Sequence, residues 1–178
     1  MQSNIFITLM GLGTVAMNAA VVLVLAGLLS PAWRVSTLAF IRRYALLVTF
    51  VFATGCLVGS LFIQYVVFLP PCDLCWWQRI FMYPIAFISG VALLKNVRFS
   101  DIADYVLVLS IPGALVALYQ HLLQMLPAGA LIPCDATGAC AVRSIFEFGY
   151  ITMPWMALST FALFILIAFI ARPVRETR

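Results

Sequence analysis

The sequence predicts an all-α integral membrane protein: a four-helix transmembrane bundle with an additional N-terminal transmembrane helix, five spans in all. Of its 178 residues, 65% are hydrophobic and only 9% are charged, and the mean hydropathy is +1.14. Soluble domains are usually about 45–50% apolar and about 25% charged. A soluble core of this length could not bury so much apolar surface, so lipid must surround most of the chain.

Five apolar runs carry the prediction of five spans, since each is near the length of about 20 residues that a helix needs to cross the hydrocarbon core. The backbone must be helical there because lipid offers it no partners. Pro84 and Pro112 are expected to bend their helices without ending them. Gly55 and Gly59 form a small-xxx-small pattern that favours close helix packing. The runs are residues 5–29, 44–69, 76–94, 105–126 and 148–170.

The basic residues predict the orientation. Eight of the ten Lys and Arg residues fall between runs one and two, between runs three and four, or after run five. The positive-inside rule assigns those segments to the cytoplasm, with the N-terminus outside and the C-terminus inside. The net charge of +4 does not indicate nucleic-acid binding, because these residues form short clusters and no basic face.

The first run is expected to be a retained helix, because it lacks a positive n-region and is too long for an ordinary signal-peptide core. The predicted organisation is an extra helix with a basic loop (residues 1–43), a four-helix core (44–171) and a basic tail (172–178). The predicted location is a bacterial plasma membrane.

Two cysteine pairs lie in the loops predicted to face outward. Cys72 and Cys75 form a CxxC, which can close and reopen a disulfide and so suits electron exchange. Cys134 and Cys140 lie in the other outer loop. Two structural disulfides and a four-cysteine metal site are the alternatives, and an oxidising space favours disulfides over metal. Cys56, in mid-helix, is expected to be a small buried hydrophobe.

The position of Arg79 favours redox catalysis over structural disulfides and over a metal site. Pro70 and Pro71 force the chain out of helical form, so Cys75 stands near the start of the third run, where the helix dipole favours a thiolate. Arg79 follows four residues later on the same helix face, about 6 Å along the axis. A charge within a membrane is costly unless it binds something.

Further polar side chains are expected at the depth of Arg79, near the outer ends of three runs. His121 among them is either a packing residue or a ligand contact. The set comprises Gln64, Gln78, Gln120, His121 and Gln124.

These residues resemble the disulfide bond formation protein B (DsbB) family. The stretch from Pro71 to Arg79 resembles the family's Cys-x-Leu-Cys-x-x-x-Arg signature, and Tyr119-Gln120-His121 resembles its Tyr-x-His. The segments 140–143 and 153–154 resemble the stretch that begins at its last cysteine. The resemblance covers about residues 44–170 and leaves the first run unmatched.

The resemblance implies a membrane thiol oxidase that takes electrons from a soluble extracytoplasmic thioredoxin-fold protein (DsbA-like). The acceptor would be a membrane quinone, either ubiquinone or menaquinone, and no metal is implied. Within bacteria, DsbA, DsbB and quinone are the known couple that keeps the periplasm oxidising.

The resemblance also implies roles for single residues. Cys134 would form a mixed disulfide with the partner, Cys140 would pass the electrons to Cys72, and the redox disulfides would be Cys72–Cys75 and Cys134–Cys140. The implied quinone contacts are Cys75, Arg79, Gln78 and His121.

One departure from well-known members is the short spacer of residues 135–139 between the last two cysteines, which resembles the short-loop, BdbC-like branch of the family. It leaves less slack for Cys140 to reach Cys72. Two rivals remain: a vitamin K epoxide reductase-like quinone oxidoreductase, in which the CxxC would come late in the chain, and a non-enzymatic membrane subunit with structural disulfides.

Overall fold

The computed structural model describes residues 2–127 and 139–172 of the chain. Long helices account for most of these residues, and five of them are long and apolar enough to cross a membrane. The predicted all-α membrane class and the five predicted spans are therefore confirmed. The helices are α1 (Gln2–Leu29), α2 (Arg34–Tyr65), α3 (Asp73–Leu94), α4 (Phe99–Met125) and α5 (Met153–Ala171).

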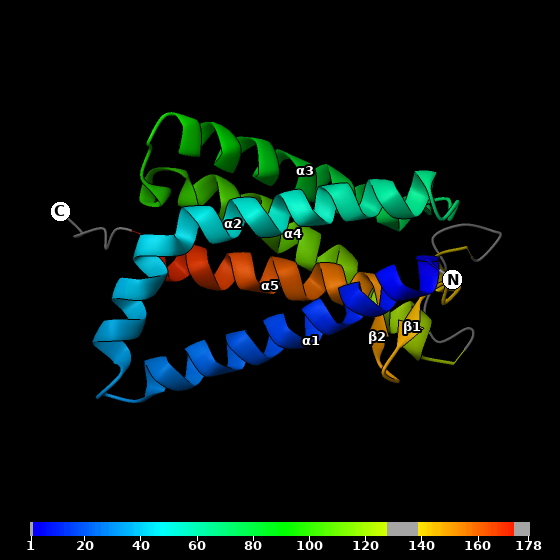
Figure 1. Ribbon diagram of the computed structural model, residues 1–178, viewed down its shortest axis with the longest axis horizontal. Coiled ribbons are helices and arrows are strands. Elements are labelled where there is room, and N and C mark those ends of the chain that lie inside the picture. Colours follow the sequence, from blue (N-terminus) through cyan, green and yellow to red (C-terminus); the bar gives the residue numbers. More distant parts are fainter. Residues whose placement is uncertain (1, 128–138, 173–178) are drawn as a thin grey trace.

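Helices α2 to α5 form the bundle, and α1 lies along one side of it (Figure 1). Contacts join α2 to α3, α3 to α4, α4 to α5 and α5 back to α2, so the four helices close a ring. Helix α1 packs on α2 and α5. In the 18-residue apolar stretch of α1 only 11% of the residues are buried, against 50% in that of α5, so most of α1 faces outward from the protein.

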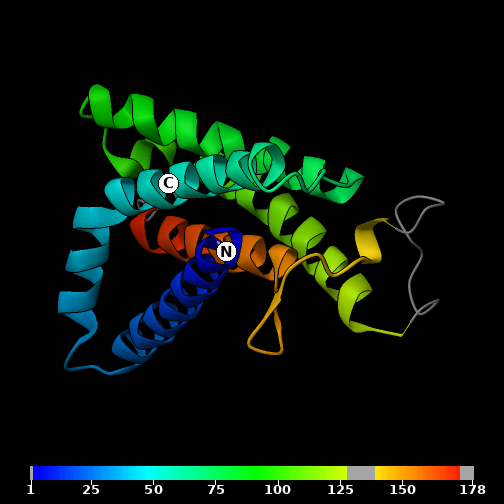
Figure 2. The same cartoon turned by 45° about the vertical axis from the view of Figure 1, so that its right-hand side comes forward.

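Helix α2 begins well before the predicted second run, because residues 34–43 contain no proline or glycine to interrupt it. The first part of α2 is turned sharply against the rest and bridges the end of α1 and the bundle (Figures 1 and 2). In α2, Arg42 Nε donates to the backbone oxygen of Ile170, at 3.4 Å, and so ties α2 to the end of α5.

The core of the bundle contains both small and large side chains. Ala53, Ala103 and Phe161 are fully buried. Gly113 on α4 lets α5 approach closely, since a Cβ at this position would overlap the Phe161 ring. Pro112, beside it, stays inside a continuous helix as predicted, and so does Pro84 in α3.

The two glycines of the predicted packing motif behave differently. A Cβ on Gly59 would lie 3.2 Å from Met10 Cε of α1, so this glycine does serve close helix packing. A Cβ on Gly55 would meet no described atom within 4 Å. The close-packing prediction therefore holds for Gly59 and is wrong for Gly55.

The fifth span begins later than the sequence predicts. Residues 146–152 form a hairpin of β1 (Phe146–Glu147) and β2 (Ile151–Thr152), paired antiparallel. Phe148 and Gly149 have φ angles of 51° and 81°, and a type I′ turn requires positive φ at both central residues. Apolar composition alone could not separate this aromatic hairpin from the helix that follows it.

Helix α5 then starts at a defined N-cap. Thr152 Oγ1 accepts a hydrogen bond from the backbone N–H of Trp155, at 3.3 Å, and Pro154 occupies the first turn, where its missing N–H costs nothing. Figure 2 shows the hairpin at the end of the bundle where α4 finishes.

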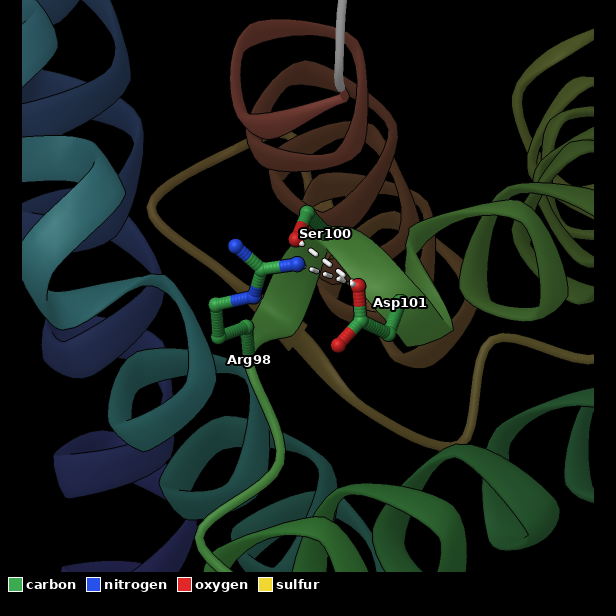
Figure 3. A network of polar contacts seen from close by, with 3 residues as sticks. All are labelled: Arg98, Ser100 and Asp101. Carbon is green, nitrogen blue, oxygen red and sulfur yellow. Dashed lines mark hydrogen bonds and ion pairs between the residues drawn. The ribbon is translucent and has the colours of Figure 1, made fainter.

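Charged side chains gather at the opposite end of the bundle. At the start of α4, Asp101 accepts a hydrogen bond from Ser100 at 3.2 Å and pairs with Arg98 at 3.5 Å (Figure 3). Arg172, just after α5, pairs with Asp104 of α4. Exposed pairs of this kind contribute about 0–1 kcal/mol each, so they mark this end as water-facing more than they stabilise it.

Gly113→Ala should destabilise the protein, because the added methyl group overlaps the Phe161 ring and overpacking costs about 1–3 kcal/mol. Gly55→Ala is the matched control: it has open space at Cβ, and alanine is the better helix former, so stability should hold or rise. Thermal unfolding of both variants in lipid nanodiscs checks this. Equal midpoints would contradict the close α4–α5 contact.

Candidate functional site

Cys72 and Cys75 lie at the start of α3, where the chain turns into the bundle. Cys72 is the N-cap, with extended φ and ψ of −78° and 173°, and its backbone oxygen accepts from the N–H of Trp76 at 3.1 Å. Cys75 sits in the first helical turn. Both are free thiols with Sγ atoms 2.8 Å apart. The two sulfurs are therefore positioned to close and reopen a disulfide without rearrangement of the helix.

A side-chain amide from α4 contacts both sulfurs. Gln120 Nε2 donates to Cys72 Sγ at 3.1 Å and to Cys75 Sγ at 3.4 Å. Gln120 is only 2% exposed, and its Oε1 accepts from Gln78 Nε2 at 2.6 Å. Gln78 thereby orients the amide so that its N–H groups point at sulfur. Donors aimed at sulfur favour the negatively charged thiolate over the neutral thiol.

The two cysteines are not equivalent. The hydrogen bond that Cys72 shares with Cys75 raises the pKa of the Cys72 thiol above its ordinary value, and burial raises it further. Cys72 is therefore the proton-holding member of the pair at neutral pH. This leaves Cys75, at the helix N-terminus, as the acceptor of that hydrogen bond.

Arg79 is buried, with 8% of its surface exposed. Its guanidinium donates to Gln64 Oε1 and, at 3.1 Å, to the backbone oxygen of Ser60, both on α2. It also lies over the Trp76 ring, 5.1 Å from the centroid. The charge is thus held between α2 and α3 on the helix that carries Cys75, as the one-turn spacing predicts.

The second cysteine segment packs against the same end of the bundle. Cys140 lies in the short helix η1 (Ala139–Ala141), is disulfide-bonded and is fully buried. Gln124 Nε2 donates to the backbone oxygens of Cys140 and Val142, at 3.3 and 3.1 Å, and Arg143 donates to the backbone oxygen of Gln124. Cys134 lies outside the described residues, so the Cys134–Cys140 pairing stays a prediction.

A cavity of about 450 Å³ opens beside the CxxC. Its polar end is lined by Cys72, Cys75, Gln78, Arg79 and Gln120. The rest is mostly apolar and is lined by α2 and α5, among others. Residues of the second cysteine segment, including Val142 and Ile145, also line it. The arrangement places a dithiol and a guanidinium at one end of an apolar chamber.

The structure places two sequence candidates elsewhere than expected. His121 is not among the described residues that line the cavity: its Nδ1 is 2.9 Å from Thr152 Oγ1, and its ring packs on Trp155. Its contact with a ligand stays a prediction. Cys56, expected to be a small buried hydrophobe, packs against the core but is only partly buried, because it also lines the cavity, with Sγ 3.6 Å from Thr160 Oγ1.

Similarity to known proteins agrees with this site. The family model described as disulfide bond formation protein DsbB matches residues 42–171. The chain belongs to the DsbB family. DsbB-family membership implies a membrane thiol–disulfide oxidoreductase, as the resemblance of the CxxC stretch indicates. No solved structure matches the chain significantly.

Individual relatives of the chain are also named for disulfide formation. Over 126 residues the chain is 35% identical to disulfide bond formation protein C of Bacillus subtilis (strain 168), covering 70% of this chain and 90% of that protein. It is 29% identical over 136 residues to probable disulfide formation protein C 2 of Bacillus anthracis, covering 76% and 96%. A probable disulfide formation protein of Coxiella burnetii (strain RSA 493 / Nine Mile phase I) is 34% identical over 120 residues, covering 66% and 80%.

The contact between Gln120 and both sulfurs could not be derived from the sequence. The sequence places Gln120 at the right depth, but its direction toward the CxxC depends on how α4 is rotated against α3. The sequence also could not predict that four residues of α1 line the cavity, because apolar residues occur on every side of this helix. The structure therefore adds an amide and a fifth helix to a site predicted mainly from the CxxC and Arg79.

Gln120→Leu should make the Cys72–Cys75 couple less oxidising, because the lost donor no longer stabilises the reduced, thiolate-bearing form. A hydrogen bond to a charged group contributes about 1.5–3 kcal/mol, which corresponds to about 30–60 mV for a two-electron couple. Equilibration with dithiothreitol buffers, read by thiol alkylation, measures the potential. Gln78→Leu, which leaves the Gln120 amide in place but unoriented, should fall between wild type and Gln120→Leu; identical potentials would rule out the contact.

Proposed function

We propose that this DsbB-family protein oxidises the dithiol of a soluble extracytoplasmic thioredoxin-fold protein, DsbA-like in kind, and passes the two electrons to a membrane quinone. The observation that carries the proposal is the cavity, which joins a CxxC dithiol and a buried guanidinium to a mostly apolar chamber. An acceptor that dissolves in lipid and carries oxygens at one end has the matching shape and polarity.

The cavity residues fit a quinone. Arg79 offers a guanidinium at the polar end for a ring oxygen. Gln124 also lines the cavity, is 6% exposed, and its Oε1 has no hydrogen-bond partner among the described residues. A buried acceptor left unpaired costs about 1–3 kcal/mol, which a hydroxyl donor of a reduced acceptor would recover. When bound, the quinone supplies a two-electron, two-proton acceptor.

The exchange sequence uses sulfur as a relay. The partner's thiolate attacks the proposed Cys134–Cys140 disulfide at Cys134 and releases Cys140 as thiolate. Cys140 attacks Cys72, breaks the Cys72–Cys75 bond and releases Cys75 as thiolate. The partner's second thiol then displaces Cys134, and the freed Cys134 thiolate attacks Cys140, which re-forms the Cys134–Cys140 disulfide and releases Cys72. The partner's two cysteines are then oxidised and the Cys72–Cys75 pair is reduced, with two electrons and two protons transferred. Each step is a thiolate attack on a disulfide sulfur, and Gln120 favours Cys75 as the leaving group.

The proposed orientation puts both cysteine segments outside the cytoplasm. Support comes from the positive-inside pattern of the basic residues and from the packing of η1 against α3 and α4, which brings the two segments to one end of the bundle. The ion-paired end with Arg98 and Arg172 would then face the cytoplasm.

Cys75→Ser should abolish turnover, to below about 1% of wild type, because a hydroxyl cannot form the disulfide through which electrons pass. The assay uses purified protein in nanodiscs, a reduced thioredoxin-fold dithiol protein, and ubiquinone or menaquinone followed by absorbance. Matching elution profiles exclude misfolding. Retained turnover in the variant would favour the rival in which the disulfides are purely structural.

Arg79→Ala should raise the KM for quinone by about 10–100-fold, the equivalent of one charge-assisted hydrogen bond of about 1.5–3 kcal/mol. Arg79→Lys keeps the charge but not the planar fork, so a smaller rise is expected. Gln64→Leu is the control for packing, since it keeps Arg79 and removes only one of the two partners of the guanidinium on α2. Should all three variants keep the wild-type KM and rate, Arg79 would not belong to the quinone site.

A further inference from the structure

Helix α1 lies outside the part of the chain that the DsbB family model matches, yet it forms one wall of the cavity. Four of its residues line the chamber. They follow one another at spacings of three, one and three, which places them on a single face of a helix with 3.6 residues per turn. We call this set the α1 wall: Met10, Gly13, Thr14 and Met17.

The α1 wall coincides with the buried part of an otherwise exposed helix. Thr14 and Met17 are each only 6% exposed, although most of α1 faces outward. Met10 Cε would lie 3.2 Å from a Cβ on Gly59 of α2, so it packs directly on this glycine. Met17 Sδ lies 4.0 Å from Thr160 Oγ1 on α5. The wall therefore spans the gap between α2 and α5 and closes the side of the chamber that those two helices leave open.

The chamber extends well below the CxxC. On α2 its lining runs from Ile63 to Val51, twelve residue steps apart, which is about 18 Å along a helix axis. This distance is more than half of the hydrocarbon core of about 30 Å. A quinone ring beside Cys75 and Arg79 would occupy only the polar end of such a length.

The lower part of the chamber offers a guest little to hydrogen-bond with. Thr14 Oγ1 donates to the backbone oxygen of Met10 at 2.9 Å, and Thr160 Oγ1 donates to that of Met156 at 3.0 Å. Cys56 faces Thr160. Ser60 Oγ and Tyr83 Oη are 2.7 Å apart and so are already hydrogen-bonded to each other. Much of the remaining lining is apolar, with flexible methionines that adapt to an irregular apolar guest.

We propose that α1 completes a channel for the apolar tail of the quinone, and that the α1 wall sets which tails this protein accepts. The proposal rests on the proposed quinone reduction and assigns the added helix a role in acceptor selection. Gly13 is the glycine of the α1 wall, and a Cβ there would meet no described atom within 4 Å, as at Gly55 on the facing α2, so a side chain added at Gly13 has open space beside the chamber.

Gly13→Leu tests the channel, since the side chain enters open space and leucine is a better helix former than glycine. Displacing about two methylenes of a tail should raise the KM for a decyl-tailed benzoquinone by about tenfold, at about 0.8 kcal/mol per methylene. The KM for tail-free benzoquinone should stay within about twofold, because the polar end is untouched. Gly13→Ala should give a smaller shift in the same direction and serves if the leucine variant folds poorly.

The matched control is Ala19→Leu. Residue 19 lies nine positions after Met10, which is about 180° around the helix, and its side chain is exposed. The same leucine added there should leave both KM values unchanged. Equal effects of the two leucines would mean that a change in α1 packing, and not the channel, is responsible, and would overturn the inference.

A second readout does not depend on turnover. A benzoquinone with a diazirine at the end of a ten-carbon tail should, on illumination, label peptides of residues 2–29, and excess decyl-tailed quinone should suppress the label. Gly13→Leu should reduce it by about tenfold, in line with the shift in affinity. Label confined to other helices, or a phospholipid that occupies the chamber and resists displacement by quinone, would overturn the inference while leaving quinone reduction intact. Wild-type protein that is neither labelled nor able to reduce quinone would overturn both proposals.

Discussion

Burying a guanidinium inside a lipid-surrounded bundle is the constraint on which this structure depends. Lipid supplies no hydrogen-bond partner, so every donor of Arg79 must be met by protein or by a ligand. Gln64 and the backbone oxygen of Ser60 meet part of that need from α2, and the Trp76 face meets another part from α3 itself. These contacts fix the position of α3 along α2, and with it the height of Cys75 in the membrane.

The same constraint links α3 to α4. Gln78 and Gln120 are buried amides, and Gln78 Nε2 donates to Gln120 Oε1 across the helix interface. With its oxygen facing Gln78, Gln120 directs its Nε2 group to the two sulfurs, which are weak acceptors as thiols and stronger ones as thiolates. The same hydrogen bonds therefore satisfy the buried amides and tune the dithiol. A substitution that removes one of these amides also changes the environment of the two sulfurs.

The fold class, the spans and the resemblance to a thiol–disulfide oxidoreductase family could be predicted from the sequence, because each depends on composition or local spacing. Hydropathy revealed the helices, and the four-residue interval between Cys75 and Arg79 placed both on one face of α3. What could not be predicted depends on helix rotation and on tertiary contact. The direction of Gln120, the pairing of His121 with Thr152 and the hollow at Gly55 are of this kind. The 146–152 hairpin was missed for another reason: an aromatic turn is as apolar as a membrane span.

The complete burial of Cys140 has a kinetic consequence. Disulfide exchange needs a line of approach to sulfur, and a covered atom is reached only when its segment opens. Gln124 and Arg143 hold that segment against α4, so opening it means breaking their hydrogen bonds. In the proposed relay Cys140 has to reach Cys72, so exchange between the two cysteine pairs would have to wait for this opening. The frequency of the opening would then limit the rate at which electrons pass from one pair to the other.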